Sequence, residues 1–100
     1  MQYVVYQITI NNNPVYIGRT SVDRIDQREK EHNKAFLSRF NKPLYNYLHS
    51  INYTGVIALE PIFIAKNKLE SKQYECYTIL YYKFEKGIKL YQKTPVIKDF

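Results

Sequence analysis

The chain has 100 residues, 45% of them hydrophobic, which is enough for one small domain with one modest core. Its net charge is +6 and its pI is about 9.4, and such a balance favours a polyanionic partner, most commonly nucleic acid. A single cysteine, Cys76, excludes an intramolecular disulfide and a cysteine-rich zinc site and fits a reducing compartment. No apolar run is long enough to cross a membrane, and the N-terminus does not read as a signal peptide.

The first eighteen residues predict a β-hairpin. Residues 2–10 are rich in β-branched and aromatic side chains and alternate, so that Tyr6 shares a face with Ile8 and Ile10. Residues 11–14 are a turn cluster of three asparagines and a proline. Residues 15–18 resume a strand, and Tyr16 and Gly18 fall on one face of it.

Residues 24–40 predict the first helix, with Asp23 as a candidate N-cap. The helical stripe consists of Ile25, Arg28, His32, Phe36 and Phe40. Arg28 and His32 are four residues apart, so they project from the same side of the helix. We therefore expect both of them beside the apolar residues that bind the helix to the sheet.

Pro43 suits the first turn of a second helix, which ends at about residues 52–55. Its expected buried side is Leu44, Tyr47, Leu48 and Ile51. Residues 56–65 predict a third strand, in which Pro61 favours an edge position or a bulge because it has no N–H to donate.

Residues 67–84 predict the last long helix, and Gly87 is a stop signal. Its expected inner face is Leu69, Gln73, Cys76, Leu80 and Phe84. The tail 88–100 is expected to be an extra strand or a loose end. The element order β-β-α-α-β-α predicts a single α+β domain over 1–100, with a small three-stranded antiparallel sheet flanked by helices.

Several side chains along this order suit the cleavage of a phosphodiester. That reaction needs a base for the attacking water, charge that stabilises the transition state and help for the leaving oxygen. A phenol with a pKa of about 10 is a poor base unless a cation lowers that pKa. With eleven tyrosines in the chain, any one of them is more often a packing residue. Arginine, by contrast, offers a permanently charged fork that matches a phosphate.

Four motifs in this order resemble the GIY-YIG nuclease family, from about Tyr3 to about Leu80. They are Val4-Val5-Tyr6, Tyr16-Ile17-Gly18, the pair Arg28 and His32, and Glu75 with Tyr77 and Ile79 after it. The first motif departs from the family, since Val-Val-Tyr replaces Gly-Ile-Tyr. Asn41 stands where some members carry a second histidine, and Gln92 where many carry an asparagine.

The resemblance implies the same fold and a metal-dependent DNA endonuclease. Tyr6 is then the preferred base, with Tyr16 as the alternative, while Arg28 stabilises the developing charge and His32 tunes the tyrosine pair. Glu75 is expected to hold one Mg²⁺ or Mn²⁺, and Glu70 is the rival carboxylate. Magnesium accepts so sparse a protein site because it keeps waters and binds substrate phosphate oxygens.

The expected partner is DNA, read mainly through its backbone and with little sequence preference. The candidate DNA-binding residues are Gly18, Arg19, Arg24, Lys34, Arg39 and Lys42. The size is typical of a free-standing phage or mobile-element nuclease, in a bacterial or virus-infected cytoplasm or a eukaryotic nucleus, with a homodimer or a targeting partner allowed. The alternatives are a non-catalytic nucleic-acid-binding module and a nuclease subunit targeted by a partner.

Overall fold

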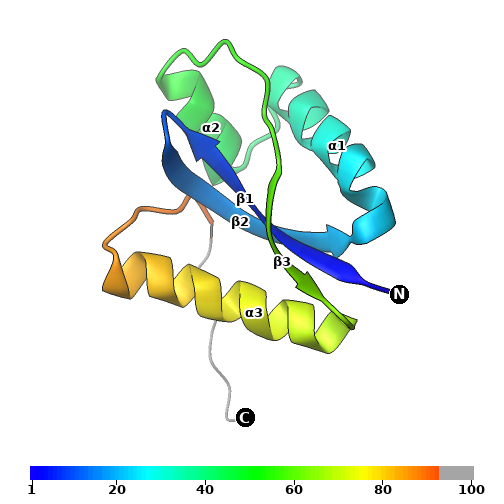
Figure 1. Ribbon diagram of the computed structural model, residues 1–100. Helices are drawn as coiled ribbons and strands as arrows, with labels where there is room; N and C mark the ends of the chain where they lie inside the picture. Colours follow the sequence, from blue (N-terminus) through cyan, green and yellow to red (C-terminus); the bar gives the residue numbers. More distant parts are fainter. Residues whose placement is uncertain (93–100) are drawn as a thin grey trace.

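The structure is a computed structural model in which residues 1–92 are described (Figure 1). Its elements are β1 (Tyr3–Ile10), β2 (Asn13–Ser21), a 3₁₀ turn (Val22–Arg24), α1 (Ile25–Leu37), α2 (Pro43–Ser50), β3 (Glu60–Ala65), α3 (Lys68–Leu80) and a closing π turn (Tyr81–Glu85). The predicted α+β order is confirmed. Within the described range, no helix has the length and apolar character needed to span a membrane.

The three strands form one antiparallel sheet in the order β2-β1-β3. Asn11 and Asn12 make the hairpin turn with φ of 52° and 67°, a left-handed conformation that asparagine tolerates better than most residues. Pro61 lies on the edge strand β3, next to a register shift in its pairing with β1. Both alternatives predicted for Pro61 are therefore confirmed together.

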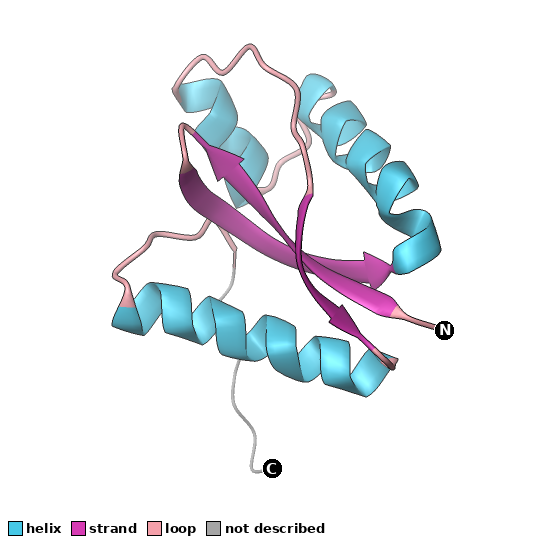
Figure 2. Ribbon diagram, viewed as in Figure 1, coloured by secondary structure: helices cyan, strands magenta, loops and turns pink. Residues whose placement is uncertain are grey.

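Helices cover both faces of the sheet (Figure 2). On one face, side chains of β1 and β2 pack against α1 and α2 in a core that includes Tyr6, Ile8, Phe36 and Leu48. On the other face, Val5 and Ile17 pack against Ile79 of α3 and against Leu90. The alternation of the strands thus sends Tyr6 to the α1 and α2 side and Ile17 to the α3 side.

The first two helices are shorter than predicted. Asp23 is not the N-cap of α1, because a 3₁₀ turn precedes the helix and its cap position is Arg24. The chain leaves α1 through Arg39, whose φ is 55°, so Phe40 lies beyond the helix and is 61% exposed. Ile51 follows the end of α2 and is also exposed, whereas Leu44 and Leu48 are buried as predicted.

The third strand begins at Glu60 rather than at residue 56, because side chains of α1 bind the preceding segment. The Asn33 amide accepts from the Ile57 N–H at 2.8 Å and donates to the Ile57 carbonyl at 2.9 Å. The Glu29 carboxylate accepts from the Leu59 N–H at 2.9 Å. These contacts satisfy backbone groups that a strand ladder would otherwise pair.

The predicted inner face of α3 is wrong. Leu69 and Phe84 are 65% and 72% exposed, and the buried residues of the helix are Ser71, Thr78 and Ile79. The Ser71 and Thr78 hydroxyls donate to backbone carbonyls of their own helix, so burying them leaves no unpaired donor. Glu75 lies on the same face of the helix as Ser71 and Thr78, so its side chain reaches the sheet.

The helix stop at Gly87 is confirmed by its φ of 63°. Beyond it, Tyr91 donates from its backbone N–H to the Val15 carbonyl at 2.8 Å, so the chain returns to β2. The rest of the tail predicted as an extra strand or loose end, residues 93–100, lies outside the described residues.

Candidate active site

Tyr6 and Gly18 face each other across β1 and β2. The Tyr6 ring lies over Gly18 so closely that a Cβ at position 18 would collide with the ring, 2.9 Å from its Cε1. Glycine is therefore required there for the tyrosine to occupy its place. The sequence suggested a close approach of DNA at Gly18, and the structure gives this internal reason for the residue.

His32 connects two phenols inside the core (α1, α2 and β1 in Figure 1). Its Nε2 lies 2.9 Å from the Tyr6 hydroxyl, and its Nδ1 lies 2.8 Å from the Tyr45 hydroxyl. Tyr6 and His32 are each 1% exposed. Tyr6 and His32 are therefore in direct contact, and Tyr45 joins them from α2.

Tyr16 and Arg28 complete this cluster at the surface. The Tyr16 ring centroid lies 6.5 Å from that of Tyr6 and 5.4 Å from that of His32. Tyr16 and Arg28 line a pocket of about 630 Å³, together with Tyr45, Lys42 and others. The four candidates Tyr6, Tyr16, Arg28 and His32 thus come together, with the tyrosine from β2 and the arginine at the solvent side.

The electrostatics of the cluster keep the phenols protonated and the arginine charged. Burial raises the pKa of Tyr6 and of Tyr16, and the Arg28 charge only partly opposes this. Burial lowers the pKa of Arg28, but Tyr6, Tyr16 and Glu31 outweigh it and the pKa ends above its ordinary value. Burial and the Arg28 charge lower the pKa of His32 to about 4, so the imidazole is neutral near pH 7.

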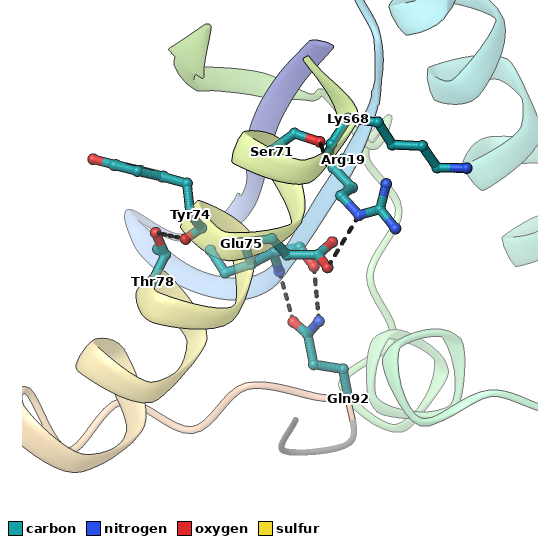
Figure 3. Close-up of polar contacts among 8 residues, drawn as sticks. Arg19, Lys68, Ser71, Tyr74, Glu75, Thr78 and Gln92 are labelled. Atoms are coloured by element: carbon teal, nitrogen blue, oxygen red, sulfur yellow. Dashed lines mark hydrogen bonds and ion pairs between the residues drawn. The ribbon is translucent and has the colours of Figure 1, made fainter. Parts of the chain in front are cut away.

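Glu75 reaches the sheet from α3, on the side opposite α1 and α2. Its Oε1 lies 3.5 Å from Nε of Arg19 on β2 (Figure 3). Burial raises the pKa of Glu75, and Arg19 opposes that shift. The Glu75 charge in turn raises the pKa of both Tyr6 and Tyr16, so the carboxylate acts on the same hydroxyls as Arg28 does.

Glu70, the rival carboxylate, has a local task. Its backbone N–H donates to the Asn67 side chain at 2.8 Å, which caps α3. Its own carboxylate accepts from the Lys66 N–H at 3.4 Å and lies 3.9 Å from the Lys66 ammonium. Glu70 therefore closes the start of the helix, whereas Glu75 pairs with Arg19 of β2.

One carboxylate is a sparse site for a metal ion. Within residues 1–92, no three side chains of the metal-binding types His, Cys, Asp and Glu gather into one site. A divalent ion of the magnesium type keeps several waters and takes oxygens from substrate phosphates, so it can use a single carboxylate when DNA is bound. Glu75 fits that requirement if Arg19 turns from it to the substrate.

The basic residues divide between the site and other surfaces. Lys42 lines the pocket with Arg28, whereas Lys34 lines a separate hollow together with Lys30 and Asn33. Arg24 and Arg39 are exposed and are not among the described residues that line the pocket. Arg19 is half-buried against Glu75.

The sequence missed Tyr45 altogether and named Gln92 without its contacts. Tyr45 was left out because Leu44, Tyr47, Leu48 and Ile51 also match a helical face. The spacing of positions 44, 45 and 48 was the signal for it. Gln92 uses both ends of its amide on Ile17, accepting from the N–H at 2.6 Å and donating to the carbonyl at 2.7 Å (Figure 3). No local pattern indicates that pairing.

Comparison of the chain with protein-family models, with curated proteins and with solved structures finds no match.

Proposed function

We propose that this protein is a metal-dependent DNA endonuclease that hydrolyses phosphodiester bonds with little sequence preference. The observation that carries the proposal is the position of Arg28, which lines the pocket. Its charge lowers the pKa values of Tyr6 and Tyr16, and the charge of Glu75 raises the same two pKa values. The net charge of +6 and the resemblance of the motifs to GIY-YIG nucleases support it.

Tyr16 is better placed than Tyr6 to meet the attacking water. Tyr16 lines the pocket, whereas Tyr6 is 1% exposed and bound to His32. Because the pKa of Tyr16 is raised, it stays a phenol and orients the water by accepting a hydrogen bond from it. Tyr16 is thus favoured over Tyr6 as the tyrosine that meets the water, but its role is to orient that water rather than to act as the base, and the proton of the water would pass to the solvent in the pocket.

Arg28 stabilises the charge that develops on the phosphate oxygens, as a guanidinium already oriented by its neighbours. Glu75 would hold one Mg²⁺ or Mn²⁺. When bound, such an ion lowers the pKa of its water and neutralises charge on the leaving oxygen. Arg19, released from Glu75, and Lys42 at the pocket then bind the DNA backbone on either side.

The test is the nicking of supercoiled plasmid by the full chain in Mg²⁺ or Mn²⁺, with EDTA and the Arg28→Ala variant as controls. Conversion to open-circle or linear DNA, lost with EDTA and with Arg28→Ala, is the expected result. A panel of duplex, branched and flap substrates then identifies the preferred structure. Cleavage that survives both controls would point to a contaminating nuclease and contradict the proposal.

One observation favours a second function, that of a non-catalytic nucleic-acid-binding module. Glu75 is ion-paired with Arg19, which leaves its carboxylate partly neutralised before any metal arrives. In that case the protein binds DNA but leaves every substrate intact in Mg²⁺ and in Mn²⁺. The plasmid assay, run beside a binding assay at the same salt concentration, separates the two functions.

A further inference from the structure

Tyr45 occupies a position that the resemblance leaves without a role. It lies in the first turn of α2, it is buried, and it also lines the pocket beside Arg28. Its hydroxyl is 2.8 Å from Nδ1 of His32, while the Tyr6 hydroxyl is 2.9 Å from Nε2. Each nitrogen of one imidazole therefore meets a phenol.

A neutral imidazole has one N–H and one acceptor nitrogen. His32 is neutral near pH 7, because burial and Arg28 lower its pKa. One phenol must therefore donate to His32 and the other must accept from it. The two distances allow either arrangement.

Burial decides between them. Tyr6 is 1% exposed, so its phenolic proton is shielded from solvent and needs an acceptor inside the protein. Among the described residues, His32 Nε2 is the acceptor within reach. Any other arrangement would bury the Tyr6 proton without a partner.

Nε2 therefore carries no proton, Nδ1 carries it, and Nδ1 donates to the Tyr45 oxygen. We propose, on the basis of the proposed nuclease function, that Tyr45 is a positioning residue that holds His32 in the Nδ1–H tautomer. The Tyr6 oxygen then keeps its lone pairs available to the positive charge of Arg28, which lines the pocket. Tyr45 keeps its own proton for a group in the pocket, such as a phosphate oxygen of the substrate.

The experiment measures the tautomer, the cleavage rate and the DNA affinity of the full chain and of Tyr45→Phe. ¹⁵N NMR of the imidazole nitrogens reports the tautomer, and the His32→Gln variant identifies which signals belong to His32. Tyr53→Phe is the matched control, since its hydroxyl donates to the Val56 carbonyl outside the site while its ring packs against the same core. The wild type should show a protonated Nδ1, which becomes a mixture in Tyr45→Phe and is unchanged in Tyr53→Phe.

Loss of this one hydrogen bond should lower the cleavage rate about tenfold, with DNA affinity changed by less than about twofold. A protonated Nε2 in the wild type, or an unchanged tautomer and rate in Tyr45→Phe, would overturn the proposal. If the wild type shows the Nδ1–H tautomer and loses it in Tyr45→Phe but cuts no DNA, the nuclease function fails while the role of Tyr45 in fixing His32 stands.

Discussion

At the scale of single residues, the site depends on groups that fix one another. Gly18 leaves room for the Tyr6 ring, Tyr6 contacts His32, and Arg28 acts on both tyrosines. The motif residues could be predicted from the sequence because their order and spacing are distinctive. The burial of these residues could not be predicted, because the spacing does not indicate that Tyr6 is buried while Tyr16 lines the pocket.

Arg28 should act on the transition state rather than on binding. In Arg28→Ala the cleavage rate should fall by on the order of a hundredfold or more, as expected for the loss of one donor that stabilises developing charge. DNA affinity at fixed salt should change much less. Arg24→Ala, an exposed arginine of the preceding turn, is the control and should cut normally. Equal losses of rate and affinity in Arg28→Ala would reduce Arg28 to a phosphate anchor.

Glu75 and Glu70 should differ in cleavage although both belong to α3. Glu75→Gln should retain the fold and DNA binding but lose cutting in Mg²⁺, because the amide is a poor ligand for that ion. Glu70→Gln should cut at the wild-type rate, since Glu70 closes the helix start. Circular dichroism and a binding assay confirm the folded state of each variant. The reverse pattern of cutting would mean that Glu70 holds the metal.

His32 should make the protein less stable in mild acid. Its pKa is about 4 in the folded protein and near 6.5 when unfolded, so the unfolded chain takes up the proton first. The free energy of unfolding therefore has its full value above pH 6.5 and decreases as the pH falls toward 4, by at most about 3 kcal/mol from this residue. Urea unfolding at pH 7 and pH 4.5 measures it. The difference between the two pH values should shrink in His32→Gln, while the opposite effect of Glu75 stays in both proteins.

At the scale of the elements, local patterns predicted the hairpin turn, the start of α2 and the stop at Gly87 better than the face of α3. The asparagines of the hairpin, Pro43 and Gly87 act through backbone geometry, which the sequence carries directly. The face of α3 depends instead on Ser71 and Thr78, whose hydroxyls bond within the helix and so can be buried. A periodicity of apolar residues cannot identify such a face.

Gln92 should stabilise the free edge of β2. Its amide pairs with both backbone groups of Ile17, beside the bond from Tyr91 to Val15. Gln92→Ala should lower the free energy of unfolding by about 1–3 kcal/mol, because two partly buried backbone groups lose their partner. Gln73→Ala, at an exposed position of α3, should stay within about 0.5 kcal/mol of the wild type in the same urea titration. If the two substitutions changed the free energy of unfolding equally, Gln92 would not stabilise the edge of β2.

At the scale of the whole molecule, the sheet separates the two halves of the proposed chemistry. Tyr6, Tyr16, His32 and Arg28 lie on the α1 and α2 side, while Glu75 comes from α3 on the other side and pairs with Arg19 of β2 (Figures 1 and 3). The charges of Arg28 and Glu75 nevertheless both affect the pKa values of Tyr6 and Tyr16. DNA that contacts Lys42 at the pocket and Arg19 beside Glu75 would therefore extend along β2.

Binding to short duplexes should be mainly electrostatic. Affinity should fall steeply and log-linearly with salt and differ little between sequences, because backbone contacts release counterions. Lys42→Ala, and Arg19→Ala on the other side of the sheet, should each weaken all sequences about equally and reduce the salt slope by about one unit. Lys34→Ala tests a further candidate that lines a different hollow, and an unchanged slope would exclude Lys34 from the DNA contacts. Fluorescence anisotropy across a salt series measures all three variants, and a flat salt dependence or a strong preference for one sequence would indicate direct reading of the bases instead.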